Sequence, residues 1–151
     1  MKNCRPGFTL IEWVVVLGII AMLLLLGLPN LFEANRRTQE SRLRLQMRAF
    51  HEANEGYHRS RLPVTYAPNL ESLTRSSPPY LDKTWEAPSR SGFDLQYLAG
   101  GEGKESYALF AVSRISSHVI RYCIDQRGIL FGGADLAATG EGCSGGAPIY
   151  N

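Results

Sequence analysis

The sequence predicts an α+β protein in which one long N-terminal α-helix packs on a small antiparallel sheet of three or four strands. Two observations predict the helix: a charge-free run of twenty residues, Trp13 to Phe32, and a charged continuation without proline from Glu33 to Leu62. A third predicts the sheet, because strand-like alternation begins only after residue 92. The 151 residues suffice for one domain of ordinary size.

The first element lies in Pro6 to Asn30, an apolar segment preceded by a basic head with Lys2 and Arg5. At about 1.5 Å per residue, its charge-free run matches the roughly 30 Å hydrocarbon core of a bilayer. A cleaved secretory signal has a shorter apolar run, of about 7–15 residues, followed by an Ala-x-Ala-like site. The run here is longer and exits through Gly27-Leu28-Pro29-Asn30, which argues against that class.

Glu12 stands just before this run and needs an explanation. An acidic side chain costs about 2.5–3.5 kcal/mol at the centre of a membrane helix, and less towards an end. No Lys or Arg lies within helical reach on its C-terminal side, and Arg5 is separated from it by Pro6 and Gly7. A cationic partner is therefore expected from another chain or from a newly made chain terminus.

Gly7-Phe8-Thr9-Leu10-Ile11-Glu12, followed by an apolar helix and Pro29, resembles the N-terminus of type IV pilins and pseudopilins. The resemblance covers about residues 5–32. It implies that a prepilin peptidase cuts between Gly7 and Phe8, that Phe8 becomes N-methylated, and that Glu12 pairs with the N-terminal amine of a neighbouring subunit. The chain departs from the family pattern at Pro6, where a basic residue is common, and at Trp13, where an aliphatic residue is usual.

Electrostatics agrees with these implications. After cleavage the α-amine of Phe8 would lie at the positive end of a helix dipole, and the Glu12 carboxylate would relieve the repulsion. Capping of its own amine by Glu12 is the intramolecular alternative to pairing with a neighbour. Farther on, Pro29 lacks an N–H and Gly27 weakens the helix, so a kink or local melting is expected there. The resemblance implies that this segment loosens in a filament.

The second element is an amphipathic continuation of the same helix. Its apolar residues recur at spacings of three and four, which predicts one buried stripe: Leu43, Met47, Phe50, Ala53 and Tyr57. A separate helix after a linker is the weaker alternative, because no Gly/Ser-rich break appears. The predicted organisation is a leader (1–7), a transmembrane and assembly helix (8–32), its amphipathic continuation (33–61) and a globular head (62–151).

Within the head, prolines between residues 63 and 88 predict a loop, with one or two helical turns at 69–73 capped by Asn69. Tyr80, Leu81 and Trp85 are expected to anchor this loop on the core. Strands are predicted at 93–98, 106–112, 119–124 and 129–131, joined by short turns into a meander. The tail from Gly132 is expected to be mobile unless it is tied down.

Two cysteines remain once Cys4 is removed with the leader. Cys123 and Cys143 would lie outside the cytoplasm, and a disulfide between them is expected to stabilise the head by roughly 3 kcal/mol. Two buried free thiols are the alternative. A metal site is disfavoured because no His lies between them.

Charge gives no indication of nucleic-acid binding. The net charge is +2, which equals the contribution of Lys2 and Arg5 in the leader, so the mature chain is balanced. Five arginines nevertheless cluster after the apolar run, at positions 36, 37, 42, 44 and 48. They are expected to contact lipid headgroups or to pair with Glu33 and Glu40, and a local basic patch is the alternative.

No catalytic motif emerges from the sequence. The glycine-rich segment at 100–105 fails the phosphate-loop pattern, because Leu98 and Glu105 stand where Gly and Ser or Thr are needed. His51, His58 and His118 have no metal-type partners, and Asp82, Glu86 and Asp94 are too scattered for a calcium site. We therefore expect neither enzymatic activity nor a cofactor or metal.

The sequence thus predicts a structural subunit of a type IV pilus-like filament that serves adhesion, motility or a related surface function. Its expected partners are copies of itself, other pilin-like subunits, prepilin peptidase, an inner-membrane assembly platform and, before assembly, the lipid bilayer. The expected location is the bacterial inner membrane, then a surface filament or a periplasmic pseudopilus. A secretion pseudopilin is the close alternative, and a monomeric single-span binding or sensor domain is an alternative of another class.

Overall fold

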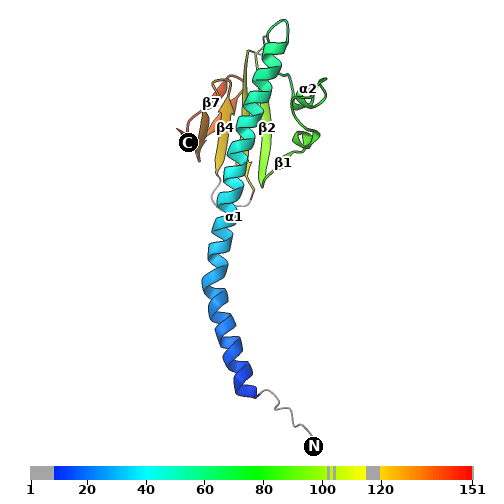
Figure 1. Ribbon diagram of the computed structural model, residues 1–151. Coiled ribbons are helices and arrows are strands. Elements are labelled where there is room, and N and C mark those ends of the chain that lie inside the picture. Colours follow the sequence, from blue (N-terminus) through cyan, green and yellow to red (C-terminus); the bar gives the residue numbers. More distant parts are fainter. Residues whose placement is uncertain (1–8, 102, 104, 115–119, 151) are drawn as a thin grey trace, which may run out of the picture. The chain divides into compact units, whose positions relative to one another are not determined.

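The computed structural model describes residues 9–101, 103, 105–114 and 120–150, apart from the side chains of residues 26–30. Its helices are α1 (Leu10–Ser60), α2 (Leu70–Thr74) and the 3₁₀ helix η1 (Lys83–Glu86) (Figure 1). The strands within the described residues are β1 (Ser89–Arg90), β2 (Phe93–Gly100), β3 (Ser106–Ser113), β4 (Arg121–Asp125), β5 (Leu130–Gly133), β6 (Ala137–Thr139), β7 (Gly142–Ser144) and β8 (Ala147–Pro148). The chain divides into two compact units, Met1–Thr38 and Gln39–Asn151.

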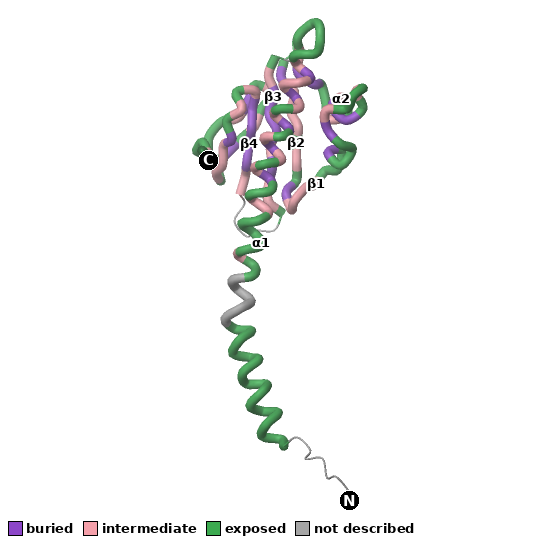
Figure 2. The backbone as a smooth tube through the Cα atoms, in the orientation of Figure 1, coloured by how far each residue is buried: buried purple, intermediate pink, exposed green. Residues whose placement is uncertain are grey.

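The first unit contains the N-terminal part of α1. Every residue from Thr9 to Leu25 is exposed (Figure 2), so none of this apolar surface is covered within the unit. In the described part of the chain, no helix combines the length and apolarity needed to cross a membrane. The membrane span over 8–32 therefore stays a prediction. The weak point at Gly27 and Pro29 also stays a prediction, and α1 is a continuous helix through both residues.

In the second unit, α1 buries the apolar stripe expected from its sequence. Leu43, Met47 and Phe50 are at most 1% exposed, and Tyr57 is also buried. They pack in one hydrophobic core with residues of the sheet and of the loop after α1. Figure 1 shows this part of α1 lying across the sheet.

The main sheet has six strands in the order β1-β2-β3-β4-β5-β8, and all neighbouring pairs are antiparallel. Alternate residues of a strand point to opposite faces. On β3, Tyr107 and Leu109 belong to the core shared with α1, whereas Ala108 and Phe110 belong to a second, smaller core. Leu136 and the β6–β7 hairpin complete that smaller core on the face opposite α1.

The predicted α+β class is confirmed, and four strands lie close to their predicted ranges. The sheet is larger than the expected three or four strands, because β1 and β8 add two short edges. The tail from Gly132 forms strands β6, β7 and β8 instead of remaining irregular. Part of the glycine-rich turn is also strand, since Ala99 and Gly100 extend β2.

The loop after α1 is held by the contacts that the sequence indicated and by one that it did not. Asn69 caps α2 by accepting a hydrogen bond from Ser72 N at 2.9 Å. Leu81 and Trp85 are buried in the core, and Tyr80 packs against it. The unexpected contact comes from Asn54, which is fully buried and accepts a hydrogen bond from Ala67 N at 3.2 Å.

Candidate assembly segment

The predicted processing site lies before the described helix. Gly7 and Phe8, the expected positions of cleavage and N-methylation, fall outside the described residues. Glu12 lies in the first turn of α1. Its carboxylate is therefore placed by the helix start, four residues after the expected new terminus.

In the unprocessed chain, Glu12 caps the helix that contains it. Thr9 N donates a hydrogen bond to Glu12 Oε2 at 3.4 Å, and Thr9 O accepts from Glu12 N at 3.1 Å. Thr followed three residues later by Glu is the pattern of a capping box, whose carboxylate reaches back to the first free N–H. Sequence reasoning considered an intramolecular cap on the Phe8 amine but overlooked Thr9, although the T-x-x-E pattern is visible in the sequence.

The surface that follows Glu12 is apolar and uncovered within its unit. Leu10 is 83% exposed, Trp13 60% and Leu25 76%, and the large apolar residues between them are also exposed. Contiguous exposed apolar surface of this kind marks contact with a membrane or with another protein.

Charged side chains resume beyond the apolar run. Arg37 Nε donates to Glu33 Oε1 at 3.0 Å, and Arg36 Nη2 donates to the same oxygen at 3.3 Å. The hydrogen bond from Arg37 holds the pKa of Glu33 below its ordinary value, with the charges of both arginines acting in the same direction. The expected pairing of this arginine cluster with Glu33 is thus present.

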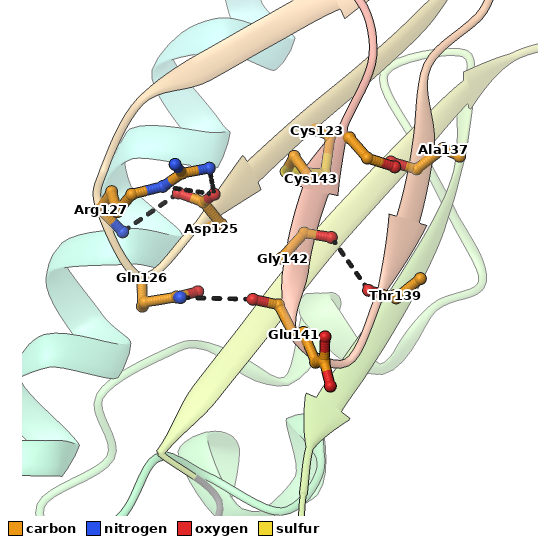
Figure 3. Close-up of a disulfide and its surroundings, with 10 residues drawn as sticks. Cys123, Asp125, Gln126, Arg127, Ala137, Thr139, Glu141, Gly142 and Cys143 are labelled. Carbon is orange, nitrogen blue, oxygen red and sulfur yellow. Dashed lines mark hydrogen bonds and ion pairs between the residues drawn. A yellow bond between two sulfur atoms is a disulfide. The ribbon is translucent and has the colours of Figure 1, made fainter.

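The expected disulfide joins Cys123 on β4 to Cys143 on β7, with their Cα atoms 5.9 Å apart (Figure 3). Two further contacts hold the same hairpin: Gln126 Nε2 donates to Glu141 O at 3.3 Å, and Ser106 Oγ donates to Gly140 O at 2.9 Å. The hairpin is therefore held by hydrogen bonds to both residues of its turn, Gly140 and Glu141, and by the disulfide on β7.

The histidines take part in packing contacts. His51 Nδ1 lies 2.6 Å from the buried hydroxyl of Tyr107, and His58 stacks on Tyr66 with ring centroids 4.1 Å apart. His118 falls outside the described residues. Among the residues that the structure covers, no group of three or more His, Cys, Asp or Glu side chains is placed to hold a metal ion.

Comparison with known families bears on this N-terminal segment. Residues 2–28 match the family model described as the prokaryotic N-terminal methylation motif, which is the class III signal peptide of type IV pilins and pseudopilins. The chain thus carries the N-terminal motif of pilin-like precursors that prepilin peptidase processes. No curated protein and no solved structure matched the chain.

Proposed function

We infer that the chain is a structural subunit of a type IV pilus-like filament. In this proposal, prepilin peptidase cleaves between Gly7 and Phe8, the Phe8 amine is methylated, and the apolar half of α1 anchors the subunit in the inner membrane before assembly. Copies then pack through these helices, with the head outside the filament core. Adhesion and motility are the surface functions that we propose for this filament.

The match of residues 2–28 to the methylation motif carries this proposal. The exposed apolar surface from Leu10 to Leu25 supports it, since copies of the same helix would cover that surface in a filament. A contact between copies that does not close on itself generates an open helical fibre, so one small subunit suffices.

Glu12 has a defined role in the proposal. In the precursor its carboxylate accepts from Thr9 N at 3.4 Å, which is long for a hydrogen bond and gives up little when broken. Cleavage creates a charged amine at Phe8, which would offer the Glu12 carboxylate an opposite full charge as well as hydrogen-bond donors, whereas Thr9 N–H offers a single neutral donor. The Glu12 carboxylate is therefore expected to leave Thr9 N and to pair with the Phe8 amine of a neighbouring subunit.

Intact-mass measurement of the protein from membranes and from sheared surface material tests the proposal. We expect a species that begins at methylated Phe8 in the sheared fraction. Glu12→Ala should abolish this species, and Glu33→Ala is the control that removes a glutamate beyond the apolar run. Glu12→Gln, which keeps the shape and removes the charge, should behave like Glu12→Ala.

The other outcomes separate the alternatives. A processed mass found only in the membrane fraction would indicate a secretion pseudopilin in place of a surface pilin. A full-length mass that includes residues 1–7 and does not respond to Glu12→Ala would reject filament assembly. That result would favour the membrane-anchored binding or sensor domain.

A further inference from the structure

A groove of about 200 Å³ runs along α1 within the second unit, lined by Ser41, Arg44, Leu45 and Arg48. Arg44, Leu45 and Arg48 lie three, four and seven residues after Ser41, so all three lie near Ser41 on one side of the helix. Leu43 is buried in the core, and two residues of helix, about 200°, separate it from Leu45. Leu45 therefore lies on the side of α1 that faces away from its own buried stripe, while Arg44 reaches back over the core residue Tyr122.

The groove is built to accept an anion. Arg44 and Arg48 lie one helical turn apart, and a guanidinium group carries hydrogen-bond donors and no acceptor. Arg44 lies over the Tyr122 ring at 5.7 Å and hydrogen-bonds the Tyr122 hydroxyl, which also lies beside Glu40, so its own chain holds this guanidinium in place. A carboxylate on the partner would meet a partly ordered guanidinium, which lowers the entropy lost on binding.

The exposure of Leu45 indicates that the ligand of the groove is a protein surface and not a small hydrated anion. Its side chain lines the groove and is 65% exposed. An apolar wall beside two guanidinium groups suits a carboxylate carried by a packed protein surface, because such a surface also covers the leucine. A free phosphate would leave that apolar surface in water.

The charge distribution indicates which protein surface this is. Residues 33–48 contain five arginines and two glutamates, whereas the head, residues 62–151, contains nine acidic and seven basic side chains. No Lys or Arg follows Arg127, and the exposed Asp135 and Glu141 lie just before the β6–β7 hairpin and in its turn, respectively. In an open head-to-tail array, the arginine-rich segment of one copy can meet the acidic head of another.

We propose that this groove docks a carboxylate on the head of a second copy of the chain. The contact rests on the proposed function, because the filament is what brings copies together. It would set the register between neighbouring heads, separately from the pairing of Glu12 near the N-terminus.

Photocrosslinking in the full-length chain tests this contact. Benzoylphenylalanine at position 45 should give a species with the mass of two processed chains, and its crosslinked peptide should come from the head, residues 62–151. Arg44→Glu combined with Arg48→Glu should lower the yield about tenfold, because it places like charges together. Arg42→Glu reverses an exposed arginine that does not line the groove, and it should leave the yield within about twofold.

The measurement has two stages, so that the proposed function and the proposed groove contact can be rejected separately. Absence of a processed species at Phe8 would reject the proposed function. Processed filaments that crosslink at position 45 to lipid or to another protein, or that crosslink to a second copy equally well in the double variant, would overturn the groove alone. If the double variant loses protease resistance, Arg48→Glu alone replaces it, with Arg48→Lys expected to retain most of the crosslink.

Discussion

At the residue scale, Gly128 illustrates how one turn constrains the core. It adopts a φ of 71°, and a β-carbon there would lie 2.7 Å from His51 Nε2. Gly101 also has a positive φ, 59°, but its nearest such neighbour is 4.0 Å away. Substitution at Gly101 would therefore test backbone strain alone, whereas substitution at Gly128 would test strain together with a steric conflict.

We expect Gly128→Ala to destabilise the protein more than Gly101→Ala. The left-handed conformation costs a residue with a β-carbon about 1–2 kcal/mol in either case. At Gly128, His51 must also move away from the buried Tyr107 hydroxyl, which adds about 1 kcal/mol or more. Thermal unfolding of the detergent-solubilised protein, followed by circular dichroism, measures both. Equal losses would mean that His51 adjusts without cost.

The partly buried Tyr97 makes stability depend on alkaline pH. Burial raises the pKa of Tyr97 to about 12, and burial likewise raises the pKa of Tyr107. The pKa of a tyrosine in the unfolded chain is about 10. Because the folded state holds its proton more tightly, the contribution of Tyr97 to stability is complete below about pH 10 and is lost as pH rises through about 12.

We therefore expect the free energy of unfolding to fall steeply above about pH 10, and to fall less steeply in Tyr97→Phe. At neutral pH the variant should lose about 1 kcal/mol, because Tyr97 Oη donates to Ala67 O at 2.5 Å. Urea unfolding between about pH 7 and pH 11.5 measures both effects. Tyr150→Phe, at an exposed tyrosine, is the control, and identical slopes in the three proteins would contradict the assignment.

At the scale of elements, the β6–β7 hairpin depends on its disulfide. The hairpin has short strands of small residues, and Leu136 is the buried side chain that it places in the smaller core. Replacing Cys123 and Cys143 by alanine should cost about 3 kcal/mol, since the bond closes a loop with a sequence separation of 20. Hydrogen exchange should accelerate most in residues 137–144 and least in β2 and β3. Uniform exchange with unchanged stability would show that packing alone holds the hairpin.

The elements that sequence reasoning identified are those whose own residues carry a strong pattern. The helix stripe and strands β2 and β3 have clear periodicities of 3.6 and two residues, and the structure contains them. The two-residue edges β1 and β8 carry no such pattern, because long-range pairing alone makes them strands. Asn54 was missed for a similar reason, since its hydrogen bond to Ala67 depends on how the loop after α1 folds back on the helix.

The pilin-like N-terminal motif was predictable because its signal is local. Gly7 to Glu12 are consecutive, and the family model matches the same region at residues 2–28. The groove at Arg44 and Arg48 was visible only as a cluster of arginines. Which of them pair within the chain depends on side-chain geometry: Arg36 and Arg37 meet Glu33, while Arg44 meets the Tyr122 ring.

At the scale of the whole molecule, the two units differ in whether their apolar side chains are buried within the unit. The buried residues of both hydrophobic cores lie between Leu43 and Leu136, all within the second unit. Residues 9–25 are exposed throughout. The second unit is therefore expected to fold by itself, whereas the apolar helix needs a membrane or other subunits to cover it.

A fragment of residues 39–151 tests this division. We expect it to fold with the Cys123–Cys143 disulfide and to remain monomeric in buffer without detergent, because the groove alone offers far less than the roughly 1,000 Å² of a stable interface. Analytical ultracentrifugation measures its mass, and near-ultraviolet circular dichroism compares its aromatic packing with that of the full chain in detergent. An unfolded fragment would mean that the apolar helix contributes to the core. A fragment that self-associates would place the main assembly contact in the head and weaken the case for assembly through residues 8–32.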